Sequence, residues 1–228
     1  QARDNVTAVA AGFRGSIRIA ISDGAVGPQL SEFLALCRKE DPDVEIRMSE
    51  MPLAEQLRGL RSGDVAIGFA HTADVGGDII AEPVWREPLV LIVPARHPLL
   101  VYRDVPLHEL KHYPLVLCDP QMCEGYSREL ERLLRPLEVE PNVVEHVSSL
   151  DMMLTLVSAG YGIGFTTSTR FGLCRRSEVV IRPLAGDSAV MTTYLLRHAN
   201  TDLSALLDRF IFRLRACATD QGYSLTQT

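Results

Sequence analysis

The sequence has few cysteines, and their spacing indicates no disulfide bond between any two of them. Five occur in 228 residues, at Cys37, Cys118, Cys123, Cys174 and Cys217. An odd and scattered set does not form the disulfide framework of a small secreted domain, and a chain of this length can bury a core without cross-links. The cysteines therefore predict reduced thiols in a cytoplasmic protein.

The chain also lacks a basic excess and a long apolar run. It has 23 Lys and Arg against 29 Asp and Glu, a net charge of −6, and a pI of about 5.5. Nucleic-acid-binding surfaces usually show a basic excess or a basic stripe. The acidic net charge therefore predicts that the chain does not itself bind DNA. No stretch is long and apolar enough to span a bilayer, and residues 1–14 lack the pattern of a signal peptide. We therefore expect no membrane partner.

Most of the familiar catalytic and metal-binding motifs are missing as well. The six histidines include one HExxH spacing, His108-Glu109-Leu110-Lys111-His112, but the short helix predicted over 106–110 does not extend to His112, so the two rings are not expected on one helix face. The sequence contains no GxSxG elbow, P-loop or dinucleotide fingerprint, and the glycines of Gly160–Gly164 follow a predicted helix, which they stop. These absences predict that the chain is not an enzyme and has no catalytic residue, metal or cofactor.

The stretch from Gly15 to Leu34 contains a strand, a polar break and a helix in immediate succession. Three isoleucines alternate before the break Ser22-Asp23-Gly24, which is a strand pattern. After the break, apolar residues recur at helical spacing, at Val26, Leu30, Phe33, Leu34 and Cys37. Backbone N–H groups and the positive end of the dipole at a helix start favour an anion such as a carboxylate.

Strand and helix patterns alternate along the rest of the chain. Strands are predicted over 44–48, 64–69, 79–80, 89–93, 115–118, 143–147, 165–166, 179–184 and 191–196, and a last helix follows 200–201. The strand–helix pattern occurs twice, with a break near 86–89. The sequence therefore predicts an α/β fold of two similar lobes with central, mostly parallel sheets.

An ordered set of motifs carries a family resemblance. They are Gly15–Ala20 (GSIRIA), Pro42-x-Val44, Leu57-x-x-Leu60-x-x-Gly63-x-Val65–Gly68, Glu87–Val93 (EPLVLIV), His97–Leu99 (HPL) and Leu156-Val157-x-Ala159-Gly160-x-Gly162-Ile163. Each motif alone is weak, but their order and spacing cover the chain from Gly15 to about Cys217. In the order and spacing of these motifs, the chain resembles the effector-binding domain of LysR-type transcriptional regulators.

The resemblance implies the fold of type 2 periplasmic binding proteins, with two lobes joined by two crossing strands. Lobe I would hold 15–86 and 192–228, lobe II 87–191, and residues 1–14 would end the linker helix from a winged helix-turn-helix domain absent from this chain. A small-molecule effector would bind in the cleft between the lobes. It would alter the geometry of a homodimer or homotetramer that contacts DNA only through the absent domain.

The resemblance also implies which residues face the effector. In lobe I they are Ser22, Asp23, Gly24 and Ala25 in the loop after the first strand, Leu53 at the start of the second helix, and His71 at the carboxyl end of a strand. In lobe II they are Met122 and Cys123 in a loop, the ring of Tyr126, Ser148 and Ser149 at a helix start, and Thr166. The expected effector is an aromatic or carboxylic acid metabolite, although a carboxylate at Asp23 would repel an anion unless it points to solvent.

Two alternatives stay open. In the peroxide-sensing branch of the family a reactive thiol lies in the loop that here contains Cys123, and only Cys118 could resolve it. The acidic neighbours Asp119 and Glu124 work against a thiolate there. The other alternative is a free-standing solute-binding protein, which would need an export signal.

Overall fold

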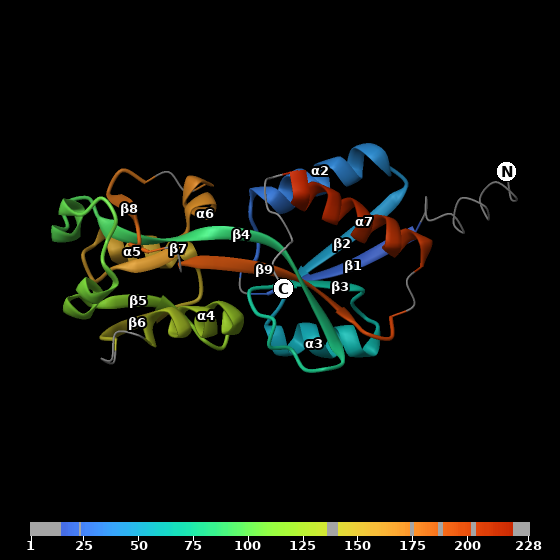
Figure 1. Ribbon diagram of the computed structural model, residues 1–228, viewed down its shortest axis with the longest axis horizontal. Coiled ribbons are helices and arrows are strands. Elements are labelled where there is room, and N and C mark those ends of the chain that lie inside the picture. Colours follow the sequence, from blue (N-terminus) through green and yellow to red (C-terminus); the bar gives the residue numbers. More distant parts are fainter. Residues whose placement is uncertain are drawn as a thin grey trace, which may run out of the picture. The chain divides into compact units, whose positions relative to one another are not determined.

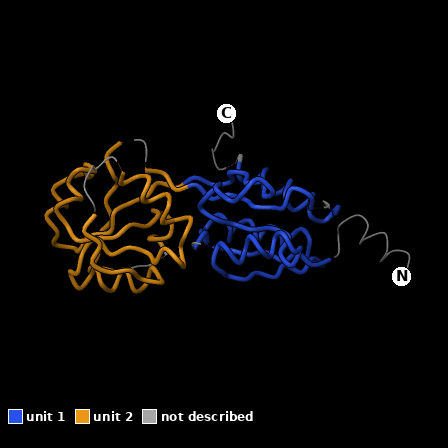
Figure 2. The backbone as a smooth tube through the Cα atoms, turned by 90° about the horizontal axis from the view of Figure 1, so that it is seen from below, with its two compact units in different colours: residues 1–86, 192–228 blue, residues 87–191 orange. Residues whose placement is uncertain are grey.

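The computed structural model describes residues 15–22, 24–135, 141–173, 176–186, 189–201 and 204–220. The chain divides into two compact units, unit 1 with residues 1–86 and 192–228, and unit 2 with residues 87–191 (Figure 2). The predicted linker helix over 1–14 lies outside the described residues. Asp23 of the predicted effector loop lies outside them too.

Unit 1 is built on two strand–helix crossovers. Strands β1 (Gly15–Ile21) and β2 (Val44–Glu50) are parallel, with Ile17 opposite Ile46, and β1 is also parallel to β3 (Ile67–Ala70). The connections are helix α2 (Pro28–Glu40) and helix α3 (Leu53–Ser62). Since parallel neighbours share an edge, the carboxyl ends of β1 and β3 lie together.

Helices cover both faces of this sheet. Helix α2 and the last helix, α7 (Ala205–Asp220), lie side by side on one face and α3 covers the other (Figure 1). The rings of Phe33 on α2 and Phe210 on α7 meet edge to face at 4.9 Å, inside one of the apolar clusters of the unit. Gly63 ends α3 in a left-handed conformation, with φ of 77°, which suits glycine.

Two long strands run through both units. They are β4 (Ile79–Pro94) and β9 (Val190–His198), which are neighbours in the sheet, and β9 also pairs antiparallel with β3. In unit 2, β4 pairs antiparallel with β7 (Gly164–Thr167) and β8 (Val179–Pro183), while β5 (Leu115–Cys118) and β6 (Val143–Val147) form a parallel pair. The remaining elements are α4 (Glu124–Leu134), α5 (Leu150–Ser158), α6 (Ser168–Leu173) and two 3₁₀ turns at Pro98–Val101 and Leu107–His112.

The glycines after α5 stop the helix and also allow close packing. Gly160 has φ of 82° just past the end of α5. A Cβ on Gly162 would lie 2.6 Å from the backbone oxygen of Pro114, and one on Gly164 would lie 2.8 Å from Sδ of Met153. The glycine run therefore lets β7 approach β5 and α5 closely.

The α/β class predicted from the sequence is confirmed, but three local predictions are wrong. Val26 was expected on the first helix, yet the helix begins at Pro28, a residue suited to a first helical turn, and Val26 is exposed. The two strands predicted around 79–80 and 89–93 are one strand, β4. Helix α6 was not predicted, because six residues are too few to show a helical period.

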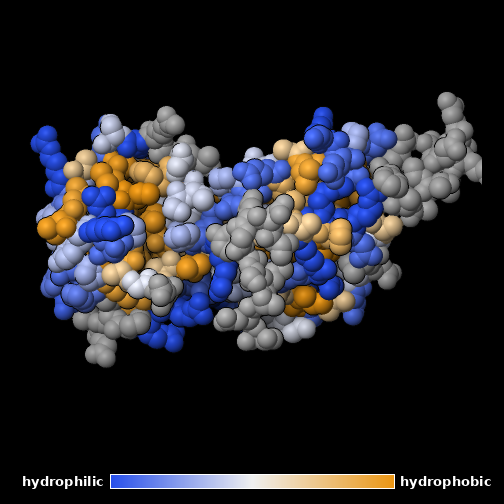
Figure 3. Space-filling model, turned by 45° about the horizontal axis from the view of Figure 1, so that its top comes forward, coloured by the Kyte–Doolittle hydropathy of each residue, from blue (hydrophilic) through white to orange (hydrophobic). Residues whose placement is uncertain are grey.

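The surface shows no single dominant apolar face in the view drawn. Apolar patches alternate with polar side chains in Figure 3. The most exposed large apolar side chains are Val101, Phe212 and Tyr161, which belong to different elements. Among the described residues, no helix combines the length and hydrophobicity needed to cross a membrane.

Candidate functional site

Ser22 follows β1 directly and is held against β3. It is fully buried, its backbone N–H donates to the Phe69 carbonyl oxygen at 3.0 Å, and its own carbonyl accepts from Ala25 at 2.9 Å. The first of these bonds places Ser22 beside the end of β3, two residues before His71. The two polar residues predicted at strand ends therefore lie at one edge of the unit 1 sheet.

Gln56 on α3 is a buried polar residue that the sequence analysis missed. Its Nε2 donates to the Ala20 carbonyl at 2.8 Å and to the Phe69 carbonyl at 3.1 Å, while Ser22 Oγ lies 3.5 Å from its Oε1. A Cβ on Gly68 would come within 2.9 Å of the Gln56 amide, so glycine there makes room for it. A signal was available, because Gln56 shares the inward face of α3 with Leu53 and Leu60.

His71 is buried just after β3. Its Nδ1 lies 3.2 Å from the Thr192 carbonyl oxygen and 3.4 Å from Thr193 Oγ1. A carbonyl oxygen can only accept, so Nδ1 carries a hydrogen and donates it. His71 is therefore held inside unit 1 and is not a solvated loop residue.

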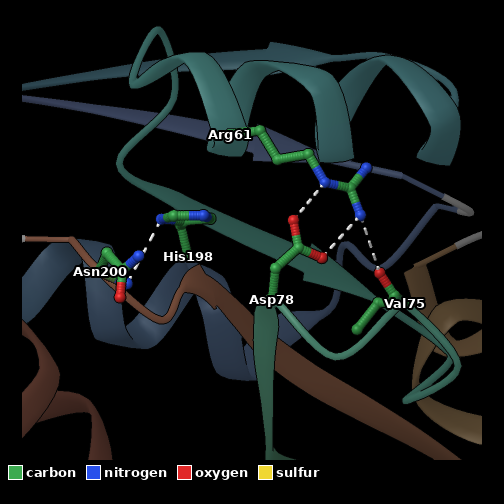
Figure 4. Close-up of polar contacts among 5 residues, drawn as sticks. All are labelled: Arg61, Val75, Asp78, His198 and Asn200. Atoms are coloured by element: carbon green, nitrogen blue, oxygen red, sulfur yellow. Dashed lines mark hydrogen bonds and ion pairs between the residues drawn. The ribbon is translucent and has the colours of Figure 1, made fainter.

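The segment that carries His71 is tied down at its far end. Arg61 donates from Nε and Nη2 to the two carboxylate oxygens of Asp78 at 2.6 and 2.9 Å, and Nη2 also reaches the Val75 carbonyl at 3.3 Å (Figure 4). The Arg61 guanidinium lowers the pKa of Asp78 to about 2. The backbone N–H of Ala199 donates to the Asp78 carbonyl at 2.8 Å. Residues 71–78 are thereby fixed to α3 and to the end of β9.

The other predicted residues of unit 1 differ in accessibility. Leu53 is 2% exposed and belongs to an apolar cluster with Leu60 and Leu196. Ala25 is buried against the other cluster of the unit, whereas Gly24 is half-buried. Gly27 caps α2 without a side-chain bond and the next residue, Pro28, has no N–H. The helix start at which an anion site was expected thus lies six residues after Ser22 and not directly after the break.

In unit 2 the predicted loop residues stand at the start of α4. Cys123 caps α4 and forms a disulfide with Cys118, the last residue of β5, with their Cα atoms 6.2 Å apart. The prediction of reduced thiols is therefore wrong for this pair, whereas Cys37 and Cys217 form no disulfide with any described residue. Burial raises the pKa of the Cys37 thiol.

Met122, the other predicted residue of this loop, is 47% exposed.

Tyr126 and Thr166 are both buried in unit 2 but differ in their bonding. The Tyr126 hydroxyl donates to the Phe165 carbonyl at 3.0 Å, its ring belongs to the apolar core of the unit, and burial raises its pKa. Thr166, on β7, is 2% exposed, and its Oγ1 has no hydrogen-bond partner among the described residues. A buried hydroxyl of this kind is costly, so Thr166 is the stronger candidate for a ligand contact.

The two serines before α5 are exposed. Ser149 Oγ accepts from the Met152 backbone N–H at 3.3 Å, which is an ordinary N-cap. Ser148 precedes it at the surface. Their predicted effector contact stays a prediction.

A cavity of about 520 Å³ lies beside α4 in unit 2. It is lined by side chains of β5, α4 and β6, among them Cys118, Ser127, Glu131 and His146. None of the residues predicted to contact an effector is among its lining residues. Across the described part of the chain, no cluster of three or more His, Cys, Asp or Glu side chains could hold a metal ion.

Comparison of the sequence with known proteins identifies the family of the chain. The LysR substrate binding domain matches residues 10–218. The uncharacterized HTH-type transcriptional regulator YnfL of Escherichia coli is 28% identical over 186 residues, which cover 81% of this chain and 62% of that protein. The regulator AlsR of Bacillus subtilis is 27% identical over 150 residues, covering 64% and 50%. The chain thus spans half to three fifths of the length of these relatives, which are transcriptional regulators rather than enzymes.

Solved structures share the fold. The effector binding domain of BenM with its effector benzoate has a TM-score of 0.82 at 22% identity, covering 93% of this chain and 95% of that one. A full-length mutant of BenM has a TM-score of 0.84 at 22% identity, covering 100% and 75%. The fold is the type 2 periplasmic-binding-like α/β fold, and the redox and solute-binding alternatives are not favoured. The chain belongs to the LysR substrate-binding family and is the effector-binding domain of a LysR-type transcriptional regulator.

Proposed function

We propose that this chain senses a small-molecule effector that contacts the carboxyl ends of β1 and β3 in unit 1. The observation that carries the proposal is the burial of three polar residues at that edge, Ser22 and Gln56, which contact each other, and His71, which contacts β9. Open α/β sheets bind ligands outside the carboxyl ends of their strands. Buried polar groups with fixed partners can orient a ligand with little reorganisation.

Thr166 is proposed as the leading effector contact of unit 2. Its buried hydroxyl, unsatisfied by the described residues, would gain a hydrogen bond from a ligand. Met122 and Ser148 are exposed enough to contribute, whereas Leu53, Tyr126 and Cys123 would act by shaping their surroundings. The solved BenM domain holds benzoate, which supports an aromatic or carboxylic acid metabolite as the effector here.

For the whole regulator, the proposal includes a DNA-binding domain outside this chain, a cytoplasmic location and a homodimer or homotetramer. The names of the relatives, which are HTH-type regulators, support this. An effector shifts such a protein only through different affinities for its conformations. A coupling of about 1–3 kcal/mol is typical of such linkage and would change DNA binding severalfold.

The test is a thermal-shift screen of this chain against a metabolite panel that includes benzoate. We expect at least one compound to raise the melting temperature, and the shift to fall in Ser22→Ala and Thr166→Val variants. Ser31→Ala, on the exposed side of α2, is the matched control and should respond like the wild type. Equal shifts in all four proteins, or no shift with any compound, would contradict the proposed site.

A further inference from the structure

The cavity of about 520 Å³ beside α4 lies wholly within unit 2 and is separate from the residues predicted to contact the effector. Small-molecule sites in proteins have volumes of about 300–1,000 Å³ and mostly apolar walls with a few polar groups. This cavity has such a wall, which includes Leu117 of β5, Leu130 and Leu134 of α4, and Val143 of β6. Its polar groups decide what it can bind.

Three polar side chains of α4 follow one another along the cavity. Ser127, Glu131 and Arg135 are spaced four residues apart, at α4 and its C-cap, and all three line the cavity. Side chains at this spacing share one face of a helix, and successive members are about 6 Å apart along the helix axis. A small molecule lying along α4 can therefore contact neighbouring members of this row at the same time.

A bulge in β6 brings His146 to the same cavity. The register of β6 against β5 shifts by one residue after Val143, so that Val144 is an extra residue. Successive residues of a strand point to opposite faces, so without this shift residues 143 and 146 would face opposite ways. With it, Val143 and His146 both line the cavity, and His146 lies opposite Leu117.

Ser127 is the buried polar residue of the cavity. It is 9% exposed, and its backbone N–H donates to the Cys123 carbonyl at 2.8 Å. Its hydroxyl makes no hydrogen bond with any other described residue. The disulfide between Cys118 and Cys123 ties the start of α4, one turn before Ser127, to the end of β5. A buried hydroxyl without a partner costs free energy, which a bound molecule with a polar group would recover.

The charged side chains of the cavity are also available to a ligand. Glu131, Arg135 and His146 are exposed, and none of them forms an ion pair with a described residue. By contrast, Arg132 on a neighbouring face of α4 pairs with Glu129 at 2.6 Å. The cavity thus combines an apolar wall with one carboxylate, one guanidinium and one imidazole that have no ion-pair partner in the described part of the chain.

We propose that this cavity is a second ligand site, which takes an apolar α-amino acid. The ammonium group donates to the Glu131 carboxylate and to the Ser127 hydroxyl oxygen, and the carboxylate accepts from Arg135 and from a ring N–H of His146. The apolar side chain packs on the leucines of the wall. A molecule with only one charged group leaves either Glu131 or Arg135 without a partner, so a zwitterion fits these residues better than a simple acid or amine.

The experiment is an NMR titration of the isotopically labelled chain, followed at the Ser127 amide and the His146 ring signals. Its three probes share a branched carbon skeleton. L-Leucine has both charged groups, 4-methylpentanoate lacks the ammonium group and 3-methylbutylamine lacks the carboxylate. We expect L-leucine to bind at least about tenfold more tightly than either of the others, because each lacks one pair of charge-assisted hydrogen bonds. No response to L-leucine, or equally tight binding of the acid or the amine, would overturn the proposal.

Two variants assign the charges. Glu131→Gln should weaken the binding of L-leucine and 3-methylbutylamine by about tenfold and leave 4-methylpentanoate unchanged, whereas Arg135→Gln should weaken L-leucine and 4-methylpentanoate and leave the amine unchanged. A purely structural role of these residues would affect all three probes alike, and that result counts against the site. Arg132→Gln, on the same helix, is the control and should bind all three probes like the wild type.

A third variant tests the buried hydroxyl. Ser127→Ala places a good helix former in α4, and L-leucine should bind roughly three- to tenfold more weakly to it while 4-methylpentanoate binds as before. An unchanged affinity for L-leucine would exclude Ser127 from the site. If the Ser127 and His146 signals shift with the concentration of the chain and not with L-leucine, a second copy of the chain covers the cavity and the proposal is wrong.

Discussion

Arg61 and Asp78 form a two-bond ion pair that joins the last turn of α3 to the residues just before β4 (Figure 4). Both side chains are exposed to solvent over more than two fifths of their surface. The pair therefore contributes to stability through its bidentate geometry rather than through burial. It holds the end of the segment that begins at His71 against α3.

The Arg61–Asp78 pair predicts a loss of stability in acid. The pKa of Asp78 is lowered from 3.8 to about 2, so the folded state binds the proton more weakly than the unfolded state does. The stabilisation is present above about pH 4 and is lost as the pH falls toward 2. Urea unfolding of the wild type and Asp78→Asn from pH 6 to pH 2 should give curves that converge at the acid end. A constant difference across this range would contradict the prediction.

Gly68 and Gln56 should be energetically coupled. A Cβ at position 68 would lie 2.9 Å from the Gln56 amide, so Gly68→Ala should destabilise the chain by about 1–3 kcal/mol. In a Gln56→Ala background the clash is gone and the same change should cost clearly less. Urea unfolding of the four proteins of this cycle measures the coupling. Strict additivity would mean that the two residues do not compete for one space.

Alanine substitutions of two phenylalanines of α7 should differ strongly in their effect on stability. Phe210 is 3% exposed and packs on Phe33, so Phe210→Ala should cost about 3–5 kcal/mol. Phe212 is 75% exposed, and Phe212→Ala should change stability by no more than about 0.5 kcal/mol. Chemical denaturation of both variants checks this. A large loss for Phe212→Ala would show that the residue is covered in solution.

Tyr126→Phe tests whether this residue is chiefly part of the core. The change removes the bond to the Phe165 carbonyl and keeps the ring, so it should cost about 0.5–1.5 kcal/mol. Tyr161, which is 63% exposed, provides the control, and Tyr161→Phe should be nearly neutral. If Tyr126→Phe leaves stability unchanged but abolishes an effector-induced thermal shift, the hydroxyl serves the ligand instead.

Much of the fold could be predicted because its signals are local. Alternating isoleucines in β1 and the apolar spacing of Leu30, Phe33 and Cys37 in α2 report burial directly. The continuity of β4 could not be predicted, since Glu82-Pro83 and Arg86-Glu87-Pro88 interrupt its apolar pattern. Pairing with other strands, which no short window contains, holds that segment extended.

The candidate site was predictable only in part for the same reason. Ser22 and His71 could be placed at strand ends from their neighbours in sequence. Their burial and these contacts depend on Gln56 and Thr192, which lie 34 and 121 residues away in the sequence. The Cys118–Cys123 disulfide was likewise hidden, because a five-residue separation says nothing about where two sulfur atoms point.

The division of the chain has a consequence for synthesis on the ribosome. Unit 2 is one uninterrupted segment, whereas unit 1 is completed only by residues 192–228. While the polypeptide is being made, Phe33 has no Phe210 to pack against and β3 has no β9. The amino-terminal half of unit 1 must therefore wait, with part of its apolar surface uncovered, until residues 192–228 have been translated. Unit 2, whose residues are all made before that point, has no such delay.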